Sequence, residues 1–73
     1  MFPLAMGKVG EEVMVCRVSG DEATRQHLAD LGFVPGTLVS IVSQNNGDVI
    51  VNLKESHLAI TKKLAEKIMV QPG

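Results

Sequence analysis

The chain has 73 residues, of which 45% are hydrophobic and 21% are charged, and its formal net charge is −1. This length allows a single domain, and the balance of hydrophobic and charged residues excludes a disordered chain. The near-neutral charge argues against a nucleic-acid-binding protein, because affinity for phosphates needs a concentrated basic patch. We expect one domain over residues 1–73, with its core over about 9–70.

The first predicted strand covers residues 11–18. Val13 and Val15 fall on one face, and Met14 and Cys16 fall on the other, so both faces are apolar. This pattern is typical of a strand that is covered on two sides or that curls into a small barrel. The apolar lead at residues 1–6 comes before it, and either packs as a cover or stays exposed.

A helix is predicted over about 21–31. Ser19 and Glu22 have the spacing of a capping box, in which the serine oxygen accepts from a backbone amide and the glutamate reaches back. Asp21 is a competing N-cap and also suits the positive end of the helix dipole.

The end of this helix carries the clearest local signals. Leu28 and Leu31 are three residues apart and therefore share one side of the helix. Gly32 follows as a left-handed cap, since without a Cβ it adopts positive φ freely. Phe33 is then placed to fold back onto the last helical turn. Two interpretations of Phe33 stay open here, a staple for the helix end and an exposed anchor for a partner.

Turns and short strands make up the rest of the chain. Pro35 and Gly36 occupy the central positions of a predicted type II turn, and Asn46 and Gly47 those of a two-residue hairpin. The expected strands cover residues 38–44, 49–53, 58–60 and 68–70. A turn is expected over 54–57, a helical turn within 61–67 and a frayed tail over 71–73. This order favours a mostly β fold, a small barrel of about five short strands with one α-helix between the first two.

Metal binding and catalysis have little support. The spacing of Cys16, His27 and His57 matches no zinc pattern. Glu55 and His57 share a face if their segment is extended, which makes them weak metal candidates, and the alternative is a polar turn beside a strand. The chain has no nucleophile elbow and no phosphate-binding glycine loop. We expect no catalytic residues, no cofactor and no enzymatic activity.

A single cysteine and the lack of long apolar runs indicate a compartment. Cys16 cannot form an internal disulfide and is expected to be a small buried hydrophobe, as is common in a reducing cytoplasm. No apolar run approaches 18 residues, and residues 1–6 lack the basic start of a signal peptide. We therefore expect a cytoplasmic protein without a membrane span.

Three motifs carry a family resemblance. They are Leu28-Ala-Asp-Leu-Gly-Phe-Val-Pro-Gly36, Leu58-Ala-Ile-Thr-Lys-Lys63 and Leu64-Ala-Glu-Lys-Ile-Met-Val70. With the elements in this order, the chain resembles the FeoA family of ferrous-iron transport accessory proteins. The module is also similar to the SH3-like C-terminal domain of iron-dependent repressors. One departure is Lys54-Glu55-Ser56, where the family often has glycine.

The resemblance implies an SH3-like β-barrel that binds the cytoplasmic side of FeoB, a membrane permease with a G-protein domain. Phe33 and Val34 are the candidate contacts, and Phe2 and Leu4 are a weaker second pair. The alternative is a stand-alone metal-responsive regulatory or adaptor domain like those of the repressors. Self-association is also open, because small barrels with apolar ends often associate.

Overall fold

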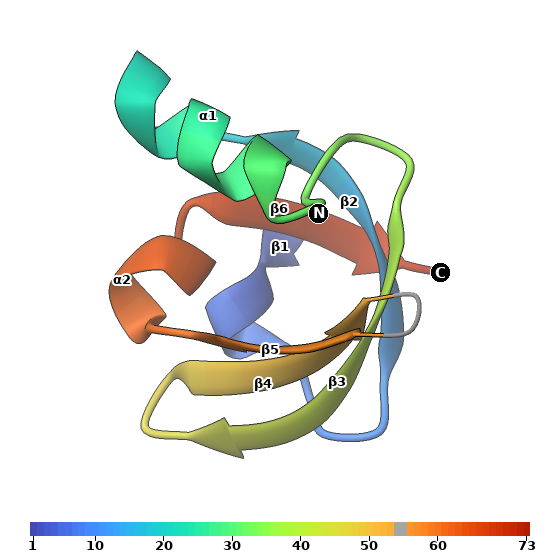
Figure 1. The fold of residues 1–73 in the computed structure, drawn as a ribbon. Helices are drawn as coiled ribbons and strands as arrows, with labels where there is room; N and C mark the ends of the chain where they lie inside the picture. Colours follow the sequence, from blue (N-terminus) through green and yellow to red (C-terminus); the bar gives the residue numbers. More distant parts are fainter. Residues whose placement is uncertain (54–55) are drawn as a thin grey trace.

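One antiparallel sheet of six strands forms the body of the molecule. The computed structural model describes residues 1–53 and 56–73. Its elements are β1 (Phe2–Pro3), the 3₁₀ turn η1 (Leu4–Met6), β2 (Glu12–Val18), α1 (Glu22–Asp30), β3 (Leu38–Asn45), β4 (Asp48–Leu53), β5 (Ser56–Ile60), α2 (Lys62–Ala65) and β6 (Ile68–Pro72). The strand order is β1-β6-β2-β3-β4-β5, and the sheet curls around a common interior (Figure 1). The predicted mostly β class is confirmed, with six strands in place of about five.

The additional strand comes from the apolar lead. Phe2 and Pro3 pair with Val70 and Met69 of β6, and Leu4 in the following turn is completely buried. The Gln44 side chain holds this segment in place, since its Nε2 donates to the C=O of Ala5 at 2.6 Å and to that of Gly7 at 2.9 Å. The lead therefore packs as a cover, one of the two arrangements that its sequence allows.

The C-terminal tail pairs with β2. Gln71 and Pro72 continue β6 opposite Met14 and Val13, and the N–H of Gly73 donates to the C=O of Glu12 at 3.0 Å. The prediction of a frayed tail over 71–73 was wrong. Backbone pairing with a strand from the other end of the chain orders this segment.

Two bulges bend the sheet. The pairing of β2 with β6 shifts between Val15 and Arg17, and that of β3 with β4 shifts between Ile41 and Ser43. A bulge adds one residue to a strand, and this increases its bend and its twist. Cys16 is the extra residue of the first bulge, and it is half-buried, whereas a buried side chain was expected.

Asp21 is the N-cap residue of helix α1. The Asp21 carboxylate accepts from the N–H of Thr24 at 2.8 Å, and this hydrogen bond lowers the pKa of Asp21. The predicted capping box was wrong, because the Ser19 hydroxyl donates instead to the C=O of Lys67 at 3.2 Å. Asp21, the competing cap in the sequence, satisfies the end of the helix.

Helix α1 ends as its sequence predicts. Gly32 has a φ of +109°, and its N–H donates to the C=O of Ala29 at 2.9 Å. The N–H of Phe33 donates to the C=O of Leu28 at 3.0 Å. These two bonds define a Schellman motif, which brings the side chains of Phe33 and Leu28 together at the helix end.

The two predicted turns are confirmed. Gly36 has a φ of +94°, and the N–H of Thr37 donates to the C=O of Val34 at 3.1 Å, as in a type II turn. Asn46 and Gly47 both have positive φ between the paired residues of the β3–β4 hairpin, as in a type I′ turn.

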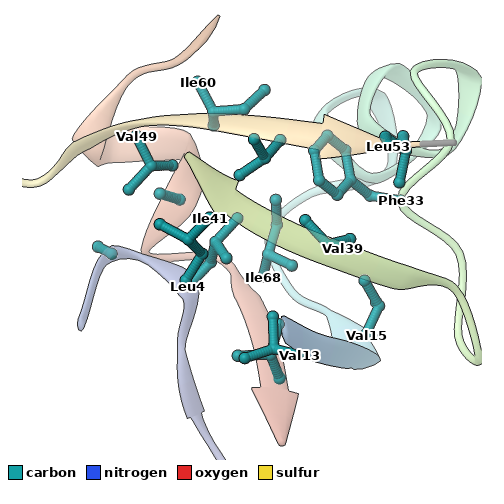
Figure 2. Packing of buried hydrophobic residues seen from close by; sticks show 14 of the residues in the cluster. Leu4, Val13, Val15, Phe33, Val39, Ile41, Val49, Leu53, Ile60 and Ile68 are labelled. Atoms are coloured by element: carbon teal, nitrogen blue, oxygen red, sulfur yellow. The ribbon is translucent and has the colours of Figure 1, made fainter. Parts of the chain in front are cut away.

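The inner face of the sheet supplies most of the core. Val39 and Ile41 of β3 and Val49, Val51 and Leu53 of β4 point inward. Helices α1 and α2 add one fully buried side chain each. Phe33 and Leu53 point into the same end of this cluster (Figure 2). The fully buried large side chains are Phe33, Leu4, Leu28, Ile41, Ile68, Val13, Val15, Val39, Val49, Val51 and Val70.

Candidate contact surface at the end of α1

The four predicted contact residues differ in exposure. Phe33 is 1% exposed and Leu4 is 0% exposed, so both belong to the core. Phe2 is half-buried in β1, where it packs against the core cluster. Val34 is 43% exposed. The burial of Phe33 corresponds to the stapling interpretation, and Val34 is the one of the four that presents a large share of its side chain to the outside.

A shallow hollow of about 450 Å³ lies beside Val34. It is bounded by the end of α1, by the turn that follows and by the ends of β4 and β5 near their connection. Its apolar wall is formed by Ala29, Leu31, Val34, Leu53 and Leu58, and Asp30, Thr37 and Ser56 add polar groups. An apolar hollow with a few polar groups at its border suits the side chain of a binding partner.

Gly32 allows the two sides of the hollow to approach each other. A Cβ atom at this position would lie 2.6 Å from Cδ2 of Leu53. Glycine is therefore required twice, for the positive φ of the helix cap and for the close packing of the cap on β4. Gly32, which follows the end of α1, is also one of the residues that line the hollow.

Backbone hydrogen bonds hold Val34 on both sides. Its N–H donates to the C=O of Gly32 at 3.0 Å, and its C=O accepts from Thr37. The turn is tied to β2 as well, because the N–H of Gly36 donates to the C=O of Val15 at 2.8 Å. The exposed valine thus stands on a rigid support.

Leu53 and Leu58 were not predicted as site residues. Both lie in apolar strand segments, which by themselves indicate only burial. Their position beside Val34 results from the pairing of β4 with β5 and from the packing of Gly32 on Leu53. Local sequence holds no signal for a wall that is assembled from distant segments.

Of the two weak metal candidates, only His57 lies within the described residues. His27 is exposed on α1, and His57 is exposed in β5, where it pairs with Asn52. A turn was predicted over residues 54–57, but Ser56 and His57 belong to a strand. Glu55 lies outside the described residues. Within residues 1–53 and 56–73, no three His, Cys, Asp or Glu side chains are close enough to hold a metal ion.

Within the part of the chain that the structure describes, no helix is long and apolar enough to span a membrane.

Comparison with known proteins gives a consistent family match. The model of the FeoA domain matches residues 2–72. A putative Fe(2+) transport protein A from Methanocaldococcus jannaschii is 39% identical over 71 residues, which are 97% of this chain and 87% of that protein.

Solved structures share the fold. The crystal structure of an iron uptake regulatory protein, FeoA, superposes with a TM-score of 0.86 at 28% identity, covering 96% of this chain and 93% of that one. The zinc complex of Stenotrophomonas maltophilia FeoA, described as an SH3 domain protein, has a TM-score of 0.83 at 22% identity, covering 97% and 91%. A manganese-dependent transcriptional repressor has a TM-score of 0.88 at 18% identity, covering 97% of this chain and 41% of that one. The last two similarities concern the fold alone, which is SH3-like.

Proposed function

The chain belongs to the FeoA family of iron transport accessory proteins, and from that premise we propose that it acts by binding the cytoplasmic side of an FeoB-type ferrous-iron permease. The family match spans nearly the whole chain, and the curated relative from Methanocaldococcus jannaschii carries the name of an Fe(2+) transport protein. The mechanism is protein–protein contact in the cytoplasm.

The observation that carries this proposal is the exposed Val34 beside the apolar hollow. Val34 is 43% exposed, although the neighbouring Phe33 is buried. An apolar side chain on a rigid turn loses little conformational entropy when it binds, because its backbone is already ordered. Partner side chains that enter the hollow would contact Leu31, Leu53 and Leu58. In protein interfaces, a few well-packed residues near the centre supply most of the binding free energy.

Binding to the soluble G-protein domain of the permease tests this proposal directly. The wild-type chain, a Val34→Ser variant and a Val9→Ser variant are titrated into that domain by isothermal calorimetry. Val9 is a matched control, since it is 59% exposed and lies outside the hollow. We expect Val34→Ser to weaken binding about tenfold, the effect of losing about 1.4 kcal/mol at a contact residue, and Val9→Ser to leave it unchanged. Equal affinity of the two variants, or a wild-type chain that does not bind, would contradict the proposal.

A second candidate function is that of a metal-responsive regulatory domain. The similarity of fold to part of the manganese-dependent repressor favours it. The two functions are separated by titration of the purified protein with Mn²⁺, Fe²⁺ and Zn²⁺. Stoichiometric binding of one of these ions that is lost in the His57→Ala variant supports a metal sensor. If the variant binds the ion with unchanged affinity, His57 is not a metal ligand.

A further inference from the structure

Asp48 lies at the α2 end of the outer face of β3, β4 and β5, and the middle of this face carries no Lys, Arg, Asp or Glu side chain. We define this middle part by the outward residues Ser40, Ser43, Ile50, Asn52, His57 and Ala59. Their strand neighbours Ile41, Val49 and Val51 are buried in the core. Because successive side chains of a strand point to opposite faces, the residues of this set point outward. The chain carries seven Lys or Arg and eight Asp or Glu residues, yet none belongs to this set. In Figure 1 it is the outside of the curled sheet formed by β3, β4 and β5.

Ile50 projects from the middle of this outer face. It pairs with Ser43 on one side and with Ala59 on the other, and both of these side chains are small. Directly paired side chains in a sheet lie about 5 Å apart, so small neighbours leave a large one standing above them. The 41% exposure of Ile50 agrees with this arrangement.

A hollow of about 280 Å³ adjoins the same isoleucine. Its lining includes Ser43, Asp48, Ile50, Ala59 and Thr61. A projecting aliphatic side chain and a recess bordered by alanine and serine therefore lie next to each other on one face. A surface that carries both parts of a contact is complementary to a copy of itself.

We propose that two copies of this chain associate through their outer faces across a two-fold axis near Ile50, with each Ile50 seated beside Ala59 of the other copy. In a two-fold interface, a residue near the axis meets its own copy, so any charged residue there would meet a like charge. The middle of the outer face, around Ile50, carries no charged side chain and satisfies this condition. It offers no counter-charge to an acidic or basic partner, whereas a second copy is uncharged at the same place.

The remaining acidic side chain near the hollow has a hydrogen-bond partner of its own. Asp48 lines the recess at its border, and its carboxylate accepts from the N–H of Lys62. Interface cores lack charge and interface borders carry it, which matches this distribution. A standard stable interface covers about 800 Å² on each partner, roughly a fifth of the 4408 Å² surface of this chain. A contact centred on one isoleucine is smaller, so the expected dimer is weak and depends on concentration.

Sedimentation equilibrium of the full chain from about 1 μM to 1 mM tests the proposal, because weak association lies in this range. We expect the mass to rise from 7.8 kDa toward twice that value with concentration. Ile50→Glu should remain monomeric throughout, because it places two carboxylates at the axis. Val34→Glu is the matched control, since Val34 is equally exposed and lies outside the outer face. This control should dimerise like the wild-type chain.

The Ala59→Leu variant distinguishes a shape-complementary interface from nonspecific hydrophobic association. The larger side chain fills the recess, so we expect it to weaken the dimer at least tenfold although it makes the face more hydrophobic. A wild-type chain that stays monomeric at 1 mM, an Ile50→Glu variant that still dimerises, or an Ala59→Leu variant that dimerises more tightly would each overturn the proposal. Retained thermal stability of the variants shows that folding is not the cause. Binding of Ile50→Glu to the permease domain is expected to be unchanged, which keeps the two proposals separable.

Discussion

Asp48 accepts a hydrogen bond from the backbone N–H of Lys62, with 2.6 Å between its Oδ1 and the nitrogen. The N-cap residue of α2, Thr61, makes no side-chain cap bond of its own, so the carboxylate from β4 takes this role. Asp48 directly follows the Asn46–Gly47 turn, which therefore positions both the hairpin and the cap of α2. Helix α2 is too short to be stable alone, and it depends on this contact and on its packing.

Removal of this carboxylate should destabilise the protein. We expect Asp48→Ala to lower the free energy of unfolding by about 1 kcal/mol, the usual effect of losing an N-cap acceptor. Asp48→Asn keeps an acceptor oxygen and should recover most of the loss. Chemical denaturation measures both, with Glu66→Ala, an exposed residue that follows α2, as the control. Equal stability of Asp48→Ala and the wild type would show that α2 does not need the cap.

Two glycines separate the effect of backbone conformation from that of close packing. Gly32 and Gly36 both have positive φ, but an added Cβ meets Leu53 only at Gly32 and meets nothing within 4 Å at Gly36. Gly36→Ala should lower the free energy of unfolding by about 1–2 kcal/mol, because alanine is strained in the left-handed conformation. Gly32→Ala should cost a further 1–3 kcal/mol or so, because Leu53 must move. Urea denaturation of the two variants compares them, and a smaller loss for Gly32→Ala than for Gly36→Ala would contradict the packing argument.

Phe33 and Val34 are adjacent in sequence, but truncation of their side chains should affect stability to very different extents. Phe33→Ala removes a core aromatic ring, and such changes cost about 3–5 kcal/mol, close to the whole stability of a small domain. Val34→Ala removes methyl groups from an exposed side chain and should change stability by less than about 0.5 kcal/mol. Circular dichroism melting curves of the two variants test this. A folded Phe33→Ala protein with a near-normal melting temperature would show that the ring is not a staple.

Asp21 should make the protein sensitive to acid. The hydrogen bond from Thr24 lowers the pKa of Asp21 below its usual 3.8 in the folded state. The stability from this cap is therefore present above pH 3.8 and is lost as the pH falls toward the lowered value. Asp21→Asn has no titrating carboxylate and should lose less stability than the wild type between pH 5 and pH 2.5 or so, as measured by thermal melting. Parallel melting curves of the two proteins over this range would count against the linkage.

The sequence predicted those features that neighbouring residues determine. The cap at Gly32, the turn at Gly36 and the hairpin at Asn46–Gly47 each depend on positive φ within a few residues, and all three were confirmed. Ser19 shows where such local rules fail. Its hydroxyl donates to Lys67, which is 48 residues away, and this bond replaces the predicted capping box.

Features that depend on distant pairing were beyond local inference. Strand β1 forms because it pairs with β6 at the other end of the chain. The tail is ordered because it pairs with β2, which lies near the start of the chain. The sequence left two roles open for Phe33, and only the packing of the whole core shows that it is buried. The hollow likewise depends on Leu53 and Leu58, which distant strands place beside the end of α1. Sequence alone therefore predicted the position of Val34 on a turn and left its surroundings undetermined.

The pairing of Phe2 with Val70 has a consequence for the connectivity of the domain. It places the first and last strands side by side, so a few flexible residues would suffice to join Met1 to Gly73. New ends could then be opened at the exposed Asn46 without separating any pair of strands that the sheet needs. Such a circular permutant should retain the same barrel, because the contacts that hold it together do not depend on where the polypeptide is cut.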